Sequence, residues 1–413
     1  MSATTSAAAY LRATPAGRLS RAATGAVVPI RAFLLSRAIV IVSGAAGALA
    51  VPRRLGWTRF DPLHVSDRLG AVGNVLAAPS IRWDSIHYLA IAGHGYAAAA
   101  DTAFFPMYPL LIRALGAVIG SAPVAGVVIS AISLTVALAL LHRLTELELG
   151  RRAADATVML LALSPLSFFF TAVYTESLFL ALSLGAVYAG RRGRWAVAGA
   201  LAGLAAVTRV PGVLLVVPLA LMCLTQHRRP GWRLGWLALA PAALACYLGY
   251  LAARGFGALA PLVQQTGAQH QHQMGGPIET LLSAVRAAAA GIHSLGAGPV
   301  YEPSIGGPFT VGAESILLLG VLALAVAALV AVFQRLPLAY GAYACAALLV
   351  STWSPVGGQP LKSVDRYTLT IFPLWMAAGA WISERRLTRA TFLVCAGLLA
   401  FWTFQFATWA WVA

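Results

Sequence analysis

The strongest constraint on the fold of this chain is a series of apolar runs, many close to twenty residues long, that recur along its 413 residues. A run of this length is what an α-helix needs to cross a hydrocarbon layer roughly 30 Å thick. Hydrophobic residues make up 60% of the chain, whereas soluble domains hold about 45–50%, and the mean hydropathy is +0.79. These features exclude a soluble globular protein and predict an all-α, polytopic membrane protein.

The charged residues indicate how the chain is threaded through the membrane. The net charge of +16 comes almost entirely from arginine, because Lys362 is the only lysine. Most arginines lie in short loops between apolar runs, which is typical of loops on the cytoplasmic side. We therefore expect no nucleic-acid partner. The cysteines lie inside apolar segments and predict neither a disulfide set nor a zinc site; they are Cys223, Cys246, Cys345 and Cys395.

This pattern predicts about eleven spans, with a cytoplasmic N-terminus and an outer C-terminus. Residues 1–31 are expected to be a disordered cytoplasmic segment, and 32–413 a single membrane domain. A short interfacial helix is expected at 104–120 and a surface helix at 278–292. The long extracytoplasmic loops are expected at about 52–121, 254–312 and 353–366. The spans are expected at about 32–51, 122–141, 157–174, 176–190, 234–253, 313–333, 337–352, 367–382 and 390–411, with two shorter helices over 195–224 that turn at Arg209.

The densest group of polar side chains lies in the first of these outer loops, within fifteen residues of a chain that is only 10% charged. Polar and ionisable groups are costly at a membrane boundary, so such a cluster indicates a functional site. Its members are Arg82, Trp83, Asp84, His87, Tyr88, His94 and Tyr96.

Asp84 is the candidate catalytic residue of this cluster. A carboxylate at the edge of the membrane can accept the proton of an attacking hydroxyl group. At helical spacing, His87 and Tyr88 share its face. The alternative is that Asp84 merely caps a helix that follows an interfacial anchor, Trp83.

Two charged residues interrupt later apolar sequence. Glu176 follows Tyr174 in the turn of a helical hairpin, where it can bind sugar hydroxyls or orient a basic group; the alternative is a first-turn glutamate favoured by the helix dipole. Arg209 needs a partner, either an anionic phosphate or Glu176. Alternatively, its side chain extends to the lipid headgroups.

Lys362 and Arg366 lie one helical turn apart in the third outer loop, on either side of Asp365. Cations on the outer side run against the positive-inside trend, and this pair suits a lipid-linked phosphate. Lipid headgroups are the alternative ligand.

No cofactor is assigned from the sequence. His270 and His272 form a short histidine tract, but no carboxylate or cysteine lies near them, so a solvated loop is favoured. The chain contains no Asp-x-Asp, GxGxxG, P-loop or HExxH pattern. A divalent metal stays an open alternative.

Several segments together resemble one family. RWDSIHYLAIAGHGY followed by TAFFPMYPLL is similar to the first luminal loop of the PIG-V family, the second mannosyltransferase of GPI-anchor assembly, and its bacterial relatives. SPLSFFFTAVYTESLFL resembles a second signature of that family, and DRYTLTIFPLW its Arg-Tyr entry to a late helix. AVTRVPG resembles the Thr-Arg turn, with Val-Pro-Gly where the family more usually has Ser-Asn-Gly.

The resemblance implies a membrane glycosyltransferase of the GT-C type, with Asp84 as general base. The expected donor is a polyprenyl-phosphate sugar, with mannose as the expected sugar, and the expected acceptor is lipid-linked, a glycan or a protein. The expected location is the plasma membrane, with the active site on the extracytoplasmic face. The residues expected to bind substrate are Arg82, Trp83, His87, Tyr88, Tyr174, Glu176, Arg209, Lys362, Arg366 and Tyr367.

The competing hypothesis is a lipid flippase or transporter, in which the membrane-embedded arginine and glutamate line a transport path. Such folds commonly show internal repeats and place polar residues at the midplane of the bilayer. Here the polar residues are expected at one face, which favours an enzyme.

Overall fold

The computed structural model is a bundle of helices with one small two-stranded sheet, and it describes residues 15–50, 61, 69–227, 229, 231–266, 275–304, 307–353 and 355–412. The first half contains α2 (Pro15–Ala50), α3 (Gly70–Leu76), η2 (Ala78–Ser80), α4 (Asp84–His94), η3 (Ala99–Ala103), α5 (Met107–Ile119), α6 (Ala122–Leu149), α7 (Arg151–Leu163), η4 (Ser167–Phe170), α8 (Glu176–Arg191) and α9 (Trp195–Ala206). The second half contains η5 (Val210–Leu215), α10 (Val216–Gln226), η6 (Gly231–Ala238), α11 (Leu239–Ala253), α12 (Ala260–Thr266), α13 (Gly276–Leu295), β1 (Tyr301–Ser304), β2 (Gly307–Phe309), α14 (Val311–Arg335), α15 (Leu338–Ser351), α16 (Val364–Thr368), α17 (Phe372–Glu384) and α18 (Thr388–Ala407).

The all-α membrane architecture predicted from the sequence is confirmed. Among the described residues, five helical stretches are long and apolar enough to cross a bilayer: Val27–Ala50, Ala122–Leu149, Gly231–Ala253, Val311–Arg335 and Thr388–Ala407. Further apolar helices are shorter than a full span, such as Trp195–Ala206 and Leu338–Ser351. The count of about eleven spans stays a prediction.

The centre of the bundle is formed by α6, α7, α8 and α17. Helix α6 packs against α7 and α8, and α17 packs against α7. Helices α7 and α17 approach closely at Gly379, where an added Cβ would lie only 2.2 Å from the Thr157 hydroxyl oxygen. A small residue is therefore needed at this crossing.

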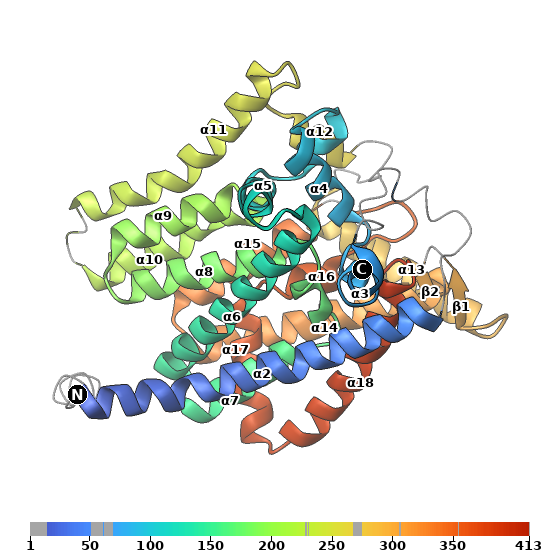
Figure 1. Cartoon of the computed structure of the whole chain (residues 1–413). Coiled ribbons are helices and arrows are strands. Elements are labelled where there is room, and N and C mark those ends of the chain that lie inside the picture. Colours follow the sequence, from blue (N-terminus) through green and yellow to red (C-terminus); the bar gives the residue numbers. More distant parts are fainter. Residues whose placement is uncertain are drawn as a thin grey trace.

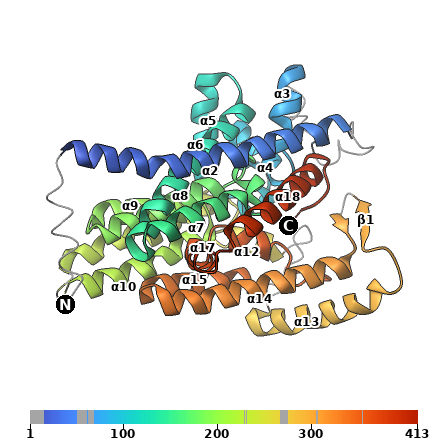
Figure 2. The same ribbon diagram turned by 90° about the horizontal axis from the view of Figure 1, so that it is seen from below.

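The elements expected outside the membrane gather at one end of the bundle. Helix α2 runs along the whole molecule, and α3, α4, β1 and the C-terminus lie toward its far end in both views (Figures 1 and 2). The N-terminal end of α2 lies at the opposite side of the picture.

Several expected boundaries hold. The segment around residues 104–120 is one short helix, α5, which ends at Gly120 with φ of +80°. The surface helix expected at 278–292 is α13, two to three residues longer at each end. The apolar stretch before Gln226 breaks between α9 and η5, so Arg209 lies in the turn, as predicted.

Other boundaries were wrong. The span expected at 157–174 ends as an α-helix at Leu163, and the chain continues through η4. Residues 367–371 do not begin the span expected at 367–382; α16 is a separate short helix, and α17 starts at Phe372, next to Pro373. Helix α2 begins at Pro15, well before the expected start at residue 32. The β1–β2 hairpin was not predicted.

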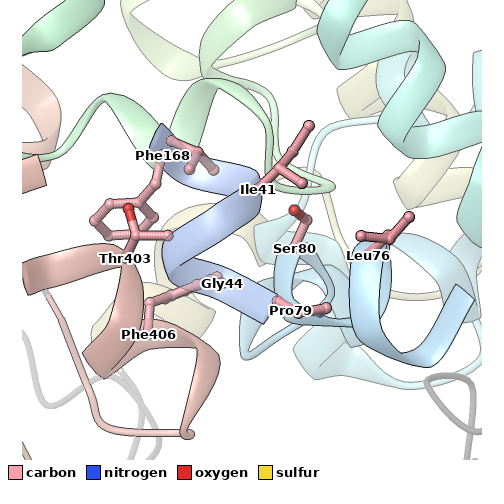
Figure 3. Close-up of a pocket in the computed structure, with 9 residues that line it drawn as sticks. Ile41, Gly44, Leu76, Pro79, Ser80, Phe168, Thr403 and Phe406 are labelled. Atoms are coloured by element: carbon pink, nitrogen blue, oxygen red, sulfur yellow. The ribbon is translucent and has the colours of Figure 1, made fainter. Parts of the chain in front are cut away.

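A shallow hollow, with about 310 Å³ of empty volume including open solvent, lies between α2, η2, η4 and α18. Figure 3 shows its lining, in which Ile41 and Gly44 of α2 face Pro79, Phe168 and Phe406. The packing between α2 and η4 is therefore incomplete on this side.

Candidate functional site

Four charged side chains from four separate elements meet in one ion-pair network. Asp84 and Glu176 are the first residues of α4 and α8, Arg209 lies in the turn before η5, and Arg366 belongs to α16. The Arg366 guanidinium donates from Nη1 to Asp84 Oδ2 (2.8 Å) and from Nε to Glu176 Oε1 (2.6 Å). The same glutamate oxygen lies 2.6 Å from Arg209 Nη1. The network holds two carboxylates and two guanidinium groups, so its formal charge is zero.

Burial makes this pairing necessary. The Glu176 side chain is fully buried, and those of Arg366 and Arg209 are 9% and 13% exposed. A buried charge is tolerated when it is paired and hydrogen-bonded. Asp84 is different, because its side chain is 24% exposed and can meet a ligand from solution.

Aromatic rings surround the two arginines. The Arg366 guanidinium lies 4.6 Å from the ring centre of Tyr174 and 5.1 Å from that of Phe169. Arg209 lies 5.6 Å from the ring centre of Tyr367. These cation–π contacts add to the ion pairs in fixing the guanidinium planes.

Tyr174 also shapes the backbone beside Asp84. Its hydroxyl donates to the Arg82 carbonyl and accepts from the Asp84 amide, each at 3.2 Å. These bonds lie on both sides of Trp83, whose φ of +53° is in a region that bulky residues rarely adopt. Local strain of this kind persists where the surroundings hold it, and it is common at functional sites.

The C-terminal segment holds the other side of this loop. Arg82 is buried, and its guanidinium donates to the Ala407 carbonyl (3.2 Å). Trp83 donates from its indole nitrogen to Ala410 (3.3 Å) and packs edge-on against Trp411, with ring centres 4.9 Å apart. Arg82 and Trp83 therefore hold the loop before α4 against the C-terminal segment.

Lys362 differs from the two arginines. Among the described residues, no carboxylate forms an ion pair with its ammonium group, which lies 4.5 Å from the ring centre of Trp411. Burial lowers the pKa of Lys362, and the charges of Glu314 and Asp84 act in the opposite direction. Lys362 is thus a partly desolvated cation near Asp84 that is available to an anion.

His87 and Tyr88 lie on α4, one turn after Asp84. The His87 ring stacks on Phe104 with ring centres 4.5 Å apart, and its Nδ1 lies 3.7 Å from Asp101 Oδ1. Tyr88 is buried, and its hydroxyl lies 3.4 Å from that of Thr175. His87 therefore faces the loop around Asp101, whereas Tyr88 packs toward the start of α8.

The structure decides between several of the sequence alternatives. The Asp84 carboxylate bonds to Arg366 and is not a helix cap, and Arg209 pairs with Glu176 instead of extending to headgroups. Lys362 contacts Trp411, and within the described part of the chain it forms no ion pair with the carboxylates of this network. His270 and His272 lie outside the described residues.

Sequence reasoning missed the contributions of Phe169 and Trp411. Phe169 stood inside an apolar run, where a ring that contacts a cation looks like any core residue. Trp411 stood in a terminal aromatic pair, Trp409 and Trp411, which reads as an interfacial anchor. Within the described residues, no group of three or more metal-ligating side chains is arranged to hold a metal ion.

Comparison with known proteins covers the first part of the chain. Residues 36–229 match the model of the mannosyltransferase (PIG-V) family. Over these residues, the chain is similar to the PIG-V family. The matched segment includes Asp84, Glu176 and Arg209, whereas Lys362 and Arg366 lie beyond it.

Individual relatives agree with this family. The chain is 30% identical over 194 residues to "GPI mannosyltransferase 2" of Yarrowia lipolytica, which covers 46% of this chain and 48% of the relative. It is 33% identical over 189 residues to "GPI alpha-1,6-mannosyltransferase 2" of Cricetulus griseus, a match that covers 43% of this chain and 36% of the relative. It is 35% identical over 191 residues to the protein of the same name in Rattus norvegicus, a match that covers 43% of this chain and 37% of the relative. The chain thus spans about half, or less, of the length of these curated relatives.

Proposed function

We propose that this protein is a membrane mannosyltransferase of the PIG-V family that moves a mannosyl residue from a polyprenyl-phosphate donor to an acceptor hydroxyl on the extracytoplasmic face. The observation that carries this proposal is the position of Asp84. It is a partly exposed carboxylate within the segment that matches the family, held from one side by Arg366. It also lies close to Lys362, which has no carboxylate partner among the described residues.

Asp84 is suited to act as the general base. Its Oδ2 accepts from Arg366, and the contacts of the described residues leave Oδ1 for an acceptor hydroxyl. The hydroxyl proton passes to Asp84 as the acceptor oxygen bonds to the anomeric carbon of mannose, and Asp84 then returns the proton to water. A positioned base of this kind contributes about 10²–10⁴ in rate.

The departing group is a phosphate, and Lys362 is suited to receive its charge. When the bond between the anomeric carbon and the phosphate oxygen breaks, the donor diester with one negative charge becomes a polyprenyl phosphate with two. A cation placed at the developing charge stabilises the transition state more than the ground state. Arg209 and Arg366 already neutralise two carboxylates, so Lys362 is the strongest of the three candidates for this role.

The remaining polar groups bind or shape the substrates in this proposal. His87 is on the same helix as Asp84 and is 40% exposed, so it can contact a sugar hydroxyl. Trp83 is half-buried and directly precedes Asp84, so its ring can contact the substrates. Arg366, Glu176, Arg209, Tyr174 and Tyr367 hold the base in place, while Arg82 and Tyr88 fix the loop and helix that carry it. The acceptor is lipid-linked, a glycan or a protein, and the cell membrane is the proposed location.

The test is transfer of radiolabelled mannose from polyprenyl-phosphate-mannose into membrane extracts with the purified protein. We expect labelled product with the wild type and none above background with Asp84→Asn at equal amounts of folded protein. Equal labelling by both proteins would remove Asp84 from the mechanism. If neither protein transfers label but liposomes containing the wild type translocate the donor lipid, the flippase hypothesis replaces the enzyme.

A further inference from the structure

A buried arginine that is not a member of the ion-pair network lies in the apolar part of α2. Arg37 is 5% exposed and stands near the middle of the stretch Val27–Ala50. Among the described residues, no carboxylate forms an ion pair with it. A charged side chain inside a membrane segment is costly and is usually functional. The polar groups that it contacts should therefore show what it does.

The guanidinium is bonded mainly to one short segment, η4 and the residue after it. Arg37 donates from Nη1 to the Ser167 carbonyl (3.0 Å) and to the Thr171 hydroxyl, and from Nη2 to the Ser167 hydroxyl (2.5 Å). Its Nε donates to the hydroxyl of its neighbour Ser36 (3.3 Å). Arg37 thus contacts both ends of η4, from Ser167 to its C-cap Thr171.

The apolar contact between η4 and α2 is interrupted by a small hollow. Phe168 of η4 lines the hollow that separates it from Ile41 and Gly44 of α2 (Figure 3). A hollow of this kind removes part of the dispersion contacts between the two elements. The hydrogen bonds of Arg37 therefore add a direct polar link between α2 and this segment to their apolar contacts.

The same segment supports the ion-pair network. Phe169 contacts the Arg366 guanidinium, and its ring centre lies 5.3 Å from that of Tyr174. The Phe170 carbonyl accepts from the hydroxyl of Ser177, the residue after Glu176 (2.7 Å). A shift of η4 would consequently move supports of both carboxylates, Asp84 through Tyr174 and Glu176 through Ser177.

We propose that Arg37 is a positioning residue, whose hydrogen bonds to Ser167 and Thr171 hold η4 so that Asp84 and Arg366 keep their reactive geometry. Its effect on transfer rests on the proposed function, whereas its effect on η4 does not. Lys362 contacts Trp411 and not η4, so the proposed phosphate contact is independent of Arg37. Loss of Arg37 should therefore impair the chemical step more than donor binding.

The test compares Arg37→Gln with Arg31→Gln, an exposed position on the same helix. The first readout is amide hydrogen exchange in peptides covering 164–176. Several amides there are bonded within the segment or to its neighbours, including Val173 to the Ser80 carbonyl (3.1 Å). We expect faster exchange in this segment for Arg37→Gln, with the other helices unchanged, and no effect for Arg31→Gln.

The second readout separates kcat from the KM for donor. For Arg37→Gln we expect kcat to fall roughly ten- to a hundredfold, because a misplacement on the order of 1 Å has effects of that size. The KM should change less than about threefold. Arg37→Lys should restore part of kcat, since an ammonium group can keep some of the bonds to η4.

Ser167→Ala provides a second variant if Arg37→Gln does not fold. It removes one acceptor and leaves the arginine in place, so the same pattern should appear at smaller size. Unchanged exchange at 164–176 in a folded variant would overturn the proposal, as would an equal increase in exchange across all helices. If the wild type transfers no mannose, the proposed function fails, and the exchange measurement still decides the role of Arg37.

Discussion

Replacing Glu176 with glutamine tests whether the four charges act as one unit. In the native network, the charges of Asp84 and Glu176 cancel those of Arg209 and Arg366. Glu176→Gln leaves two guanidinium groups with one carboxylate, a formal charge of +1 at a fully buried position. Arg209→Gln leaves a charge of −1, and the double variant returns the network to zero.

The structure indicates the size of each effect. Removing one partner of a buried ion pair costs about 3–5 kcal/mol. We expect Glu176→Gln to lie near the lower end, because an amide oxygen can still accept from Arg366. Arg209→Gln should cost about 1.5–3 kcal/mol, typical of a hydrogen bond to a charged group, since Glu176 keeps Arg366. The double variant should cost less than the sum, by about 0.5–3 kcal/mol.

The measurement is the half-life of the folded protein in detergent at one elevated temperature, followed by tryptophan fluorescence. Rates are appropriate because large membrane proteins often unfold irreversibly. A tenfold change in rate corresponds to about 1.4 kcal/mol in the barrier. Arg335→Gln is the matched control, since it breaks the more exposed pair between Arg335 and Glu384 and should cost less than about 1 kcal/mol.

Strict additivity of the two single variants would refute the reasoning, because Glu176 and Arg209 would then act independently. A cost for Glu176→Gln no larger than that of the control would also refute it. In that case, the burial of Glu176 would not require compensation.

Further outcomes follow from the same geometry. Lys362→Gln should lower kcat and also raise the KM for donor at equal amounts of folded protein, because the ammonium group is proposed to contact the phosphate as its charge develops. Donor binding by the wild type should weaken at a lower pH than in Lys362→Arg, because burial lowers the pKa of the lysine and its charge is lost as the pH rises. Burial raises the pKa of Asp365 from 3.8 to about 7, so the folded protein keeps a proton that the unfolded chain releases at lower pH. The stability of the folded protein should therefore fall as the pH rises from about 4 to about 7. Measured by thermal unfolding, Asp365→Asn should stabilise the protein at pH 8 but not at pH 4. In a cysteine-free background, a membrane-impermeant thiol reagent applied from outside should label cysteines at positions 84 and 362 but not at 152 or 192; labelling of 192 with protection of 84 would invert the topology.

The sequence alone was sufficient for most of the helices. Apolar length and the position of arginines are local properties, and they predict spans such as α6 and α14 within a few residues at their outer ends. The break at Arg209 was predictable for the same reason, because one helix through that region would have been too long and would have reversed the loop charges. The motifs around Asp84 and Glu176 also indicated the family before any contact was known.

The tertiary structure decided how the charges are paired. Arg366 is 282 residues from Asp84 and 190 from Glu176 in sequence, and no local pattern encodes which cation meets which carboxylate over such separations. Ion pairing depends on distances of a few ångströms and on burial, which are set by how α4, α8 and α16 pack. That packing shows that Arg209 pairs with Glu176 and that Arg366 pairs with both Glu176 and Asp84, whereas Lys362 forms no ion pair with a carboxylate among the described residues. The packing also shows that Arg37, a charge in the first apolar run, bonds to η4. The sequence does not indicate this contact, because the acceptors of Arg37 lie 130 and 134 residues further along the chain.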